Sequence, residues 1–373
     1  MIHSRLVRFL LLLVLATTSV AVLAQDPDSG ARHVKGFDLP ASAYLSAQAR
    51  KKVIADANSV DPLASMDNAA LVRSLQHLRE GTDAWAKGEV AKLRARHAVE
   101  ISHEQWGGVH VVLVEPKGAK GARGEQLLIE LHGGGFVLGS AESMGLLDAI
   151  PVAAASGMTV AAVEYRQGPE SHFPAATDDV LRVYRAALER LPPSRIGLFG
   201  CSSGGVLTAE VLARIAVESL PMPGAAGVFC AGGDARYGGD SRFISAAING
   251  LAPPPSQART EIMEDLYYGD VDFRDPLVSP AFSDDVLRHF PPTLFVTATR
   301  APELSSAVYM HGRLTRLGRG PQLNVWDGLG HAFYLDADLP ESREAFEVIA
   351  GFFRDHLVPA TPDAAQQHFP AAS

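Results

Sequence analysis

From about residue 108 onward, short apolar segments alternate with longer segments whose apolar residues recur at helical spacing. A continuously apolar segment is typical of a strand buried on both faces, whereas apolar residues three or four positions apart indicate a helix packed on one side. The strand candidates are 108–116, 126–131, 159–166, 195–199, 225–230, 293–298 and 322–326. This alternation predicts a mostly parallel sheet with helices on both faces, an α/β fold.

The part of the chain before these strands has a different pattern. Residues 25–105 carry apolar positions at helical spacing, chiefly in 41–57 and 69–79, and contain no clear strand. We interpret residues 25–105 as an N-terminal helical cap, or lid, and residues 106–357 as the α/β core.

Two further segments depart from the strand–helix alternation. Residues 235–290 are rich in proline and irregular, with a helix expected around 259–268, and we interpret them as a second lid segment. A last helix is expected near 342–356. The polar tail that follows, residues 358–373, is predicted to be disordered.

The first residues have the pattern of a targeting segment. Arg5 and Arg8 precede an apolar run at 9–16, and small residues at 22–24 come before Gln25. This pattern predicts a bacterial secretory signal peptide at residues 1–24, and hence a secreted or periplasmic protein without stable membrane insertion after cleavage. An uncleaved membrane anchor is the alternative.

Composition limits the partners of the protein. The chain has 373 residues, a net charge of −9 and 20% charged residues, without acidic blocks. An acidic chain of this kind is not expected to bind nucleic acid or an anionic membrane surface. The two cysteines, Cys201 and Cys230, end apolar strands, where free buried thiols are common, although a disulfide between them stays open.

No histidine, cysteine and carboxylate cluster has the spacing of a metal site, so no metal is expected. His110 lies in the first strand candidate, 108–116, and His103 lies shortly before it. We interpret both as ordinary strand residues.

The segment Gly200-Cys201-Ser202-Ser203-Gly204-Gly205 lies between the apolar strand 195–199 and the helix-forming segment 206–213. Strand, G-x-S-x-G and helix in this order define a nucleophile elbow, a tight turn that pushes the serine hydroxyl out of the sheet. Ser202 is therefore the candidate nucleophile, and the backbone N–H of Ser203 is a candidate donor to an oxyanion.

Two other loops carry residues that this chemistry needs. His132-Gly133-Gly134-Gly135 ends a strand, and the bare N–H groups of Gly133 and Gly134 are predicted to complete the oxyanion hole. We interpret His132 as a residue that orients this loop. His331 follows the last strand, where it can reach Ser202 as the general base.

With these motifs in place, residues 106–356 resemble the hormone-sensitive-lipase-type branch of the α/β-hydrolase family. The matching segments are His132–Phe136, Glu164–Arg166, Pro169–Glu170, Phe173–Ala176, the elbow, Asp275–Pro280, Pro291–Leu294 and Gly330–Phe333. The resemblance implies an α/β-hydrolase fold with a helical cap and a Ser–His–acid triad. It also implies a preference for small to medium acyl esters, no cofactor, and a homodimer formed through the sheet edge.

The chain departs from the family at the triad acid. The family pattern places an aspartate where this sequence has Ala301, in the segment 297–305. Three alternatives stay open: Glu303 replaces the aspartate from two positions further on, Asp234 or another carboxylate does so, or the protein has no functional acid.

The sequence thus favours a carboxylic-ester hydrolase in which Ser202 is the nucleophile, His331 the base and Glu303 the provisional acid. The alternative, suggested by Ala301, is a catalytically impaired relative that binds a small hydrophobic ligand without turnover. In either case the expected partner is a small molecule.

Overall fold

The computed structural model describes Val34, Gly36 and residues 38–57, 68–118, 125–250 and 262–358. By its internal contacts the chain divides into Met1–Pro40 and Ala41–Ser373, and the following description concerns the second unit. The signal peptide expected at 1–24 and the tail beyond Val358 lie outside the described residues.

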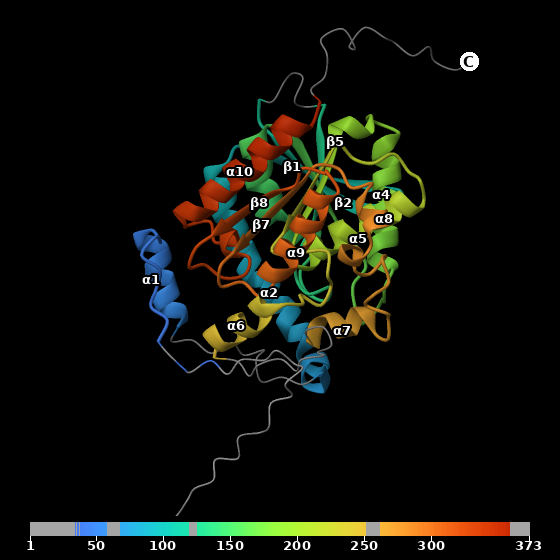
Figure 1. Ribbon diagram of the computed structural model, residues 1–373. Helices are drawn as coiled ribbons and strands as arrows, with labels where there is room; N and C mark the ends of the chain where they lie inside the picture. The colour runs from blue at the N-terminus through green and yellow to red at the C-terminus, as the bar shows by residue number, and fades with distance from the viewer. Residues whose placement is uncertain are drawn as a thin grey trace, which may run out of the picture. The chain divides into compact units, whose positions relative to one another are not determined.

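Within the described residues, eight strands form one sheet in the order β1-β2-β4-β3-β5-β6-β7-β8 (Figure 1). The pairs β1–β2 and β2–β4 are antiparallel, and all other neighbours are parallel. The strands are β1 Val99–Trp106, β2 Val109–Pro116, β3 Leu127–Leu131, β4 Thr159–Val163, β5 Ile196–Cys201, β6 Ala225–Phe229, β7 Thr293–Ala298 and β8 Gln322–Trp326. The mostly parallel sheet expected from the apolar segments is confirmed.

Helices connect these strands and cover both faces of the sheet (Figure 1). They are α1 Ala47–Asp56, α2 Asn68–Arg96, α3 Leu146–Ser156, α4 Ala175–Leu188, α5 Ser203–Val217, α6 Asp240–Ile248, α7 Ile262–Tyr268, α8 Asp284–Leu287, α9 Leu304–Arg316 and α10 Pro340–His356. Short helical turns complete the fold: η3 Ala141–Gly145, η4 Pro193–Arg195, η5 Pro280–Phe282 and η6 Phe333–Leu335. None of the described helices combines the length and the apolar character needed to cross a membrane.

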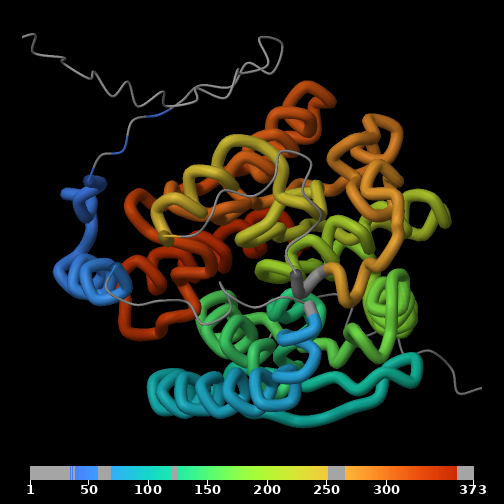
Figure 2. Tube along the Cα trace, turned by 90° about the horizontal axis from the view of Figure 1, so that it is seen from below, coloured from blue at the N-terminus to red at the C-terminus, as the bar shows by residue number. Residues whose placement is uncertain are grey.

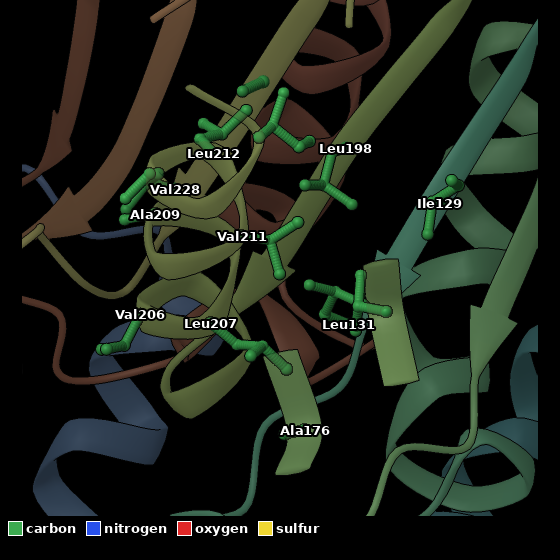
Figure 3. Packing of buried hydrophobic residues seen from close by; sticks show 14 of the residues in the cluster. Ile129, Leu131, Ala176, Leu198, Val206, Leu207, Ala209, Val211, Leu212 and Val228 are labelled. Carbon is green, nitrogen blue, oxygen red and sulfur yellow. The ribbon is translucent and has the colours of Figure 1, made fainter. Parts of the chain in front are cut away.

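The core consists of two large apolar clusters, one on each face of the sheet. Along β3, Ile129 and Leu131 belong to the first cluster and Leu128 to the second, as the alternation of side chains along a strand requires. The first cluster joins the sheet to α4, α5 and α9, and Figure 3 shows Leu131 of β3 and Leu207 of α5 among its members. The second cluster joins the sheet to α2, α3 and α10.

The region 25–105, in which the sequence showed no clear strand, contains the start of one. β1, Val99–Trp106, begins within this region and pairs with β2 along its whole length. Most of its side chains are exposed, because β1 is an edge strand with a single neighbour. An exposed edge strand has no continuous apolar run, and this is why the sequence pattern does not reveal it.

The helix expected at 69–79 is much longer than its prediction. α2 runs from Asn68 to Arg96 and continues through Gly81 without a break. Its buried positions continue beyond the glycine with Ala86, Val90 and Leu93, so tertiary packing offsets the roughly 1 kcal/mol that a helical glycine costs. α2 contacts α3 in the second cluster, and its light-blue tube is seen in Figure 2.

Candidate active site

Ser202 occupies a strained backbone position between β5 and α5. Its φ is 58° and its ψ is −124°, values that a non-glycine residue rarely adopts. The turn is tight enough to require glycine beside it, because a Cβ at Gly204 would lie 1.8 Å from the Leu131 carbonyl oxygen. The N–H of Ser202 donates to the Phe229 carbonyl of β6 at 2.9 Å, which anchors the turn to the sheet.

Ser202, His331 and Glu303 form one hydrogen-bonded chain. Nε2 of His331 lies 2.9 Å from Oγ of Ser202, and Nδ1 of His331 lies 2.9 Å from Oε2 of Glu303. The three residues follow the parallel strands β5, β8 and β7, whose carboxyl ends meet at the same edge of the sheet. An ionised carboxylate can only accept hydrogen bonds, so an imidazole that faces one through Nδ1 carries its proton on Nδ1. Nε2 is then unprotonated and can accept a hydrogen bond from the serine hydroxyl.

Both oxygens of Glu303 have partners. The side chain is 0% exposed, and its Oε1 accepts a hydrogen bond from Oγ1 of Thr297 at 3.0 Å, while Oε2 faces His331. Glu303 lies at the N-terminal end of α9, which begins at Leu304. The carboxylate is therefore held in one orientation by a hydroxyl on one side and an imidazole on the other.

The other positions considered for the acid lie elsewhere. Ala301 is 1% exposed and belongs to the second apolar cluster. The Asp234 carboxylate accepts the backbone N–H groups of Arg236 at 3.1 Å and Gly238 at 2.9 Å, which fixes its own loop. Of the alternatives open at the sequence level, the geometry brings Glu303 to His331.

The glycine loop after β3 lies against the nucleophile. A Cβ built on Gly133 would lie 3.3 Å from Cβ of Ser202. Within the described residues, neither Gly133 nor Gly134 donates its backbone N–H to a protein acceptor. The N–H of Ser203 begins α5, where a helix leaves its first donors without intrahelical partners. These three amides are thus available to an oxygen atom bound beside Ser202.

His132 and Tyr165 support this loop from within the core. Nδ1 of His132 lies 2.8 Å from the Gly133 carbonyl oxygen, and the Tyr165 hydroxyl donates to the His132 carbonyl at 2.6 Å. The two rings are stacked, with centroids 4.3 Å apart. Burial lowers the pKa of His132 to about 4, so its imidazole is neutral at physiological pH. This geometry suits the loop-orienting role expected for His132.

Helix α2 is fastened to the same loop through Arg79. Its Nε donates to the Val137 carbonyl at 2.8 Å, and its Nη2 donates to the Gly168 carbonyl at 2.9 Å. The guanidinium also pairs with both carboxylate oxygens of Glu170, which raises the pKa of Arg79 and lowers that of Glu170. Leu75 of α2 packs in a small cluster with Val137.

We expect Arg79→Ala to lower kcat for ester hydrolysis about tenfold, because small displacements of catalytic groups cost rate steeply. Arg79→Lys should recover little of the loss, since one ammonium group cannot reach all the acceptors of a planar guanidinium. Steady-state kinetics on a short-acyl ester measure the effect, and Arg73→Ala, at an exposed position of the same helix, is the control. Equal losses for Arg73→Ala and Arg79→Ala would contradict this role.

The two cysteines beneath the elbow are free thiols, so the disulfide left open by the sequence is absent. Burial raises the pKa of both Cys201 and Cys230, which keeps the thiols protonated and unsuited to nucleophilic attack. Two carboxyl groups, Glu130 and Asp148, are buried in the same region, and burial raises the pKa of each. The layer under Ser202 is therefore polar, and burial disfavours the charged form of its two carboxyl groups.

Sequence reasoning did not single out Thr297 or Arg79. Thr297 is a polar residue between the apolar Val296 and Ala298 in strand β7, and a buried hydroxyl close to a candidate acid is a usable signal. Arg79 gives no comparable signal, because the positions of its acceptors depend on how α2 packs against two distant loops.

Comparison with known proteins agrees with this fold. A family profile described as alpha/beta hydrolase fold matches residues 128–335. An acetyl-hydrolase of Streptomyces hygroscopicus is 32% identical over 229 residues, which make up 61% of this chain and 75% of the relative. The crystal structure of an esterase, E25, is 29% identical with a TM-score of 0.75 and covers 88% of this chain and 99% of its own.

A second solved structure, an esterase from the bacterial hormone-sensitive lipase family, is 27% identical with a TM-score of 0.64 and covers 80% of this chain and 100% of its own. The chain belongs to the α/β-hydrolase family. Its structural neighbours include this esterase from the bacterial hormone-sensitive lipase family, which confirms the resemblance carried by the sequence motifs.

Proposed function

We propose that this protein is a serine carboxylesterase that works through an acyl-enzyme on Ser202. The observation that carries the proposal is the continuous chain of hydrogen bonds from Ser202 through His331 to Glu303, with 2.9 Å at each of the two His331 contacts. A serine hydroxyl is a weak nucleophile until an adjacent base removes its proton, and this arrangement provides that base with a fixed tautomer.

In the first half-reaction, Oγ of Ser202 attacks the ester carbonyl carbon while Nε2 of His331 takes the hydroxyl proton. The resulting oxyanion accepts hydrogen bonds from the N–H groups of Gly133, Gly134 and Ser203. Collapse of the tetrahedral intermediate breaks the bond to the alcohol oxygen, which leaves with the proton from His331. Glu303 stabilises the imidazolium throughout.

In the second half-reaction, water takes the place of the alcohol. His331 removes a proton from the water as it attacks the acyl carbonyl, and the same amides stabilise the second oxyanion. Ser202 then leaves with the proton returned by His331, and the carboxylic acid is released. No step requires a redox group or a metal, because the chain supplies the nucleophile, the base and the oxyanion donors.

The substrate class proposed is small to medium acyl esters. Its support is the similarity to an acetyl-hydrolase and to esterases of known structure. Two structural facts are compatible with a restricted acyl site: Leu75 of α2 packs on the loop that carries Gly133 and Gly134, and Leu266 of α7 packs beside it.

A second candidate function is a binding protein without turnover, and Ala301 at the family's usual acid position is the observation behind it. The hydrogen bond between Glu303 and His331 favours the enzyme, because the acid has a substitute in the required orientation.

An active-site serine probe distinguishes the two functions. We expect a fluorophosphonate to label the native protein on the peptide that contains Ser202, and the same preparation to hydrolyse p-nitrophenyl acetate. The Ser202→Ala variant and heat-denatured protein serve as unlabelled controls. If the folded protein neither takes the label nor turns over short-acyl esters, it is not an esterase, and the binding function is the one that stands.

A further inference from the structure

Two histidines on neighbouring strands lie on the same face of the sheet, away from Ser202. In the antiparallel register of β1 and β2, His103 pairs with Val112 and Gln105 pairs with His110. Side chains two positions apart on a strand share a face, so His103 and His110 are diagonal neighbours. Their rings are stacked, with centroids 5.5 Å apart and planes 9° from parallel.

A carboxylate from a different element completes the group. Oε1 of Glu142, in the short helix η3, lies 2.9 Å from Nδ1 of His103 and 3.6 Å from Nε2 of His110. The three ligand atoms all lie within 4.8 Å of one another. Both imidazoles thus converge on the same oxygen, although the strands and η3 are separated along the chain.

We propose that His103, His110 and Glu142 bind one divalent transition-metal ion of the zinc type, with water in the remaining position. Two imidazoles and one carboxylate form a donor set that zinc uses in proteins. Bonds of about 2.0–2.1 Å in a tetrahedral arrangement place neighbouring ligand atoms about 3.3 Å apart. The observed separations of 2.9 and 3.6 Å lie on either side of that value.

The exposure of the three side chains leaves the ion a path from solvent. The side chains of His103, His110 and Glu142 are 51%, 34% and 50% exposed. Side chains this exposed adjust their rotamers at little cost in packing. Magnesium and calcium prefer oxygen ligands, so two imidazoles select against them.

A second carboxyl group, that of Glu164, lies next to these ligands. Glu164 donates its backbone N–H to the His110 carbonyl at 3.0 Å, and its side chain accepts the Ala141 N–H at 2.7 Å. It interacts electrostatically with both His110 and Glu142. Glu164 thus adds a second carboxyl group next to His110 and Glu142, and outer carboxyl groups commonly orient ligating histidines.

Because of the position of η3, an ion at this site would link two parts of the fold. η3 begins directly after the loop that carries Gly133 and Gly134, and Gly145 N–H closes it on the Ser140 carbonyl at 3.0 Å. A metal bound by Glu142 and the two histidines would cross-link η3 to the β1–β2 hairpin. The far end of the glycine loop would then be tied to the edge of the sheet.

Zinc binding to untagged, chelator-dialysed protein tests the site by isothermal titration calorimetry and by the shift in melting temperature. We expect one ion per chain and a rise in Tm with zinc. Loss of an outer partner alone costs a metal site about 10- to 100-fold in affinity. His103→Ala and His110→Ala, which remove ligands, should therefore weaken binding at least as much and abolish the rise in Tm. Glu142→Gln, which keeps the size of the side chain, should also weaken binding.

Controls separate this site from other histidines and from catalysis. His289→Ala, at an exposed position after α8, should bind zinc like the native protein, and so should Ser202→Ala. The melting temperature without metal shows whether each variant is folded. If a histidine variant does not fold, Glu142→Gln takes its place as the test of the site. Equal zinc uptake by native protein and the ligand variants, no zinc-dependent heat, or equal affinity for magnesium would each overturn the proposal.

Discussion

Glu303→Gln should lower kcat for ester hydrolysis about 10⁴-fold with little change in KM. Glutamine keeps the volume of the side chain, and the Thr297 hydroxyl can still donate to its carbonyl oxygen. Its amide group, however, places hydrogen atoms against Nδ1 of His331. The imidazole then favours the tautomer with its proton on Nε2, which cannot accept from Ser202, and no charge remains to stabilise the imidazolium.

Steady-state kinetics on a short-acyl p-nitrophenyl ester measure this loss. Glu303→Asp keeps the charge on a shorter side chain and should retain more activity than Glu303→Gln. Asp234→Asn is the matched control, because that carboxylate caps its own loop through Arg236 and Gly238 and should leave kcat unchanged. A loss in Asp234→Asn as large as in Glu303→Gln would remove Glu303 from its proposed role.

Gly134→Ala should lower kcat about 10²- to 10³-fold through loss of oxyanion stabilisation. The φ of Gly134 is +128°, a value that side-chain-bearing residues rarely adopt, and a Cβ there would lie 2.1 Å from the Leu138 carbonyl oxygen. The Val137 and Leu138 N–H groups both donate to the Gly134 carbonyl, at 3.1 and 2.9 Å. The new methyl group must therefore open this turn and move the amides beside Ser202.

The matched control for Gly134→Ala is Gly318→Ala, at the end of α9. Gly318 has a φ of +70° and open space around its Cβ position, so alanine there brings the strain of positive φ without a steric clash. Gly318→Ala should lower the melting temperature but leave kcat unchanged. If Gly134→Ala retains full kcat while folded, the glycine loop does not form the oxyanion hole.

The sequence predicted the parts of the protein that depend on local pattern. Strands buried on both faces are continuous apolar segments, and β3, β5, β6 and β7 were identifiable for that reason. The elbow was identifiable because a strained turn needs glycines at fixed spacing around Ser202. Both signals come from residues adjacent in the sequence, and no tertiary information was needed to interpret them.

The sequence was less informative where a contact joins distant segments. It left Glu303 and Asp234 as alternatives, because only the packing of the loop after β7 decides which carboxylate reaches His331. His103 and His110 looked like ordinary strand residues, because Glu142 joins them from a separate element only after folding. In each case the deciding quantity is a distance between segments, which a hydrophobic pattern does not encode.

The link from Arg79 to the Val137 and Gly168 carbonyls has a bearing on engineering this enzyme. One route to a different substrate range is to replace α2 with the corresponding helix of another hydrolase. In this protein such a replacement would discard the guanidinium that braces the loop of Gly133 and Gly134. A chimera that changes acyl preference without sacrificing turnover must therefore carry an arginine at the equivalent place, together with its two backbone acceptors.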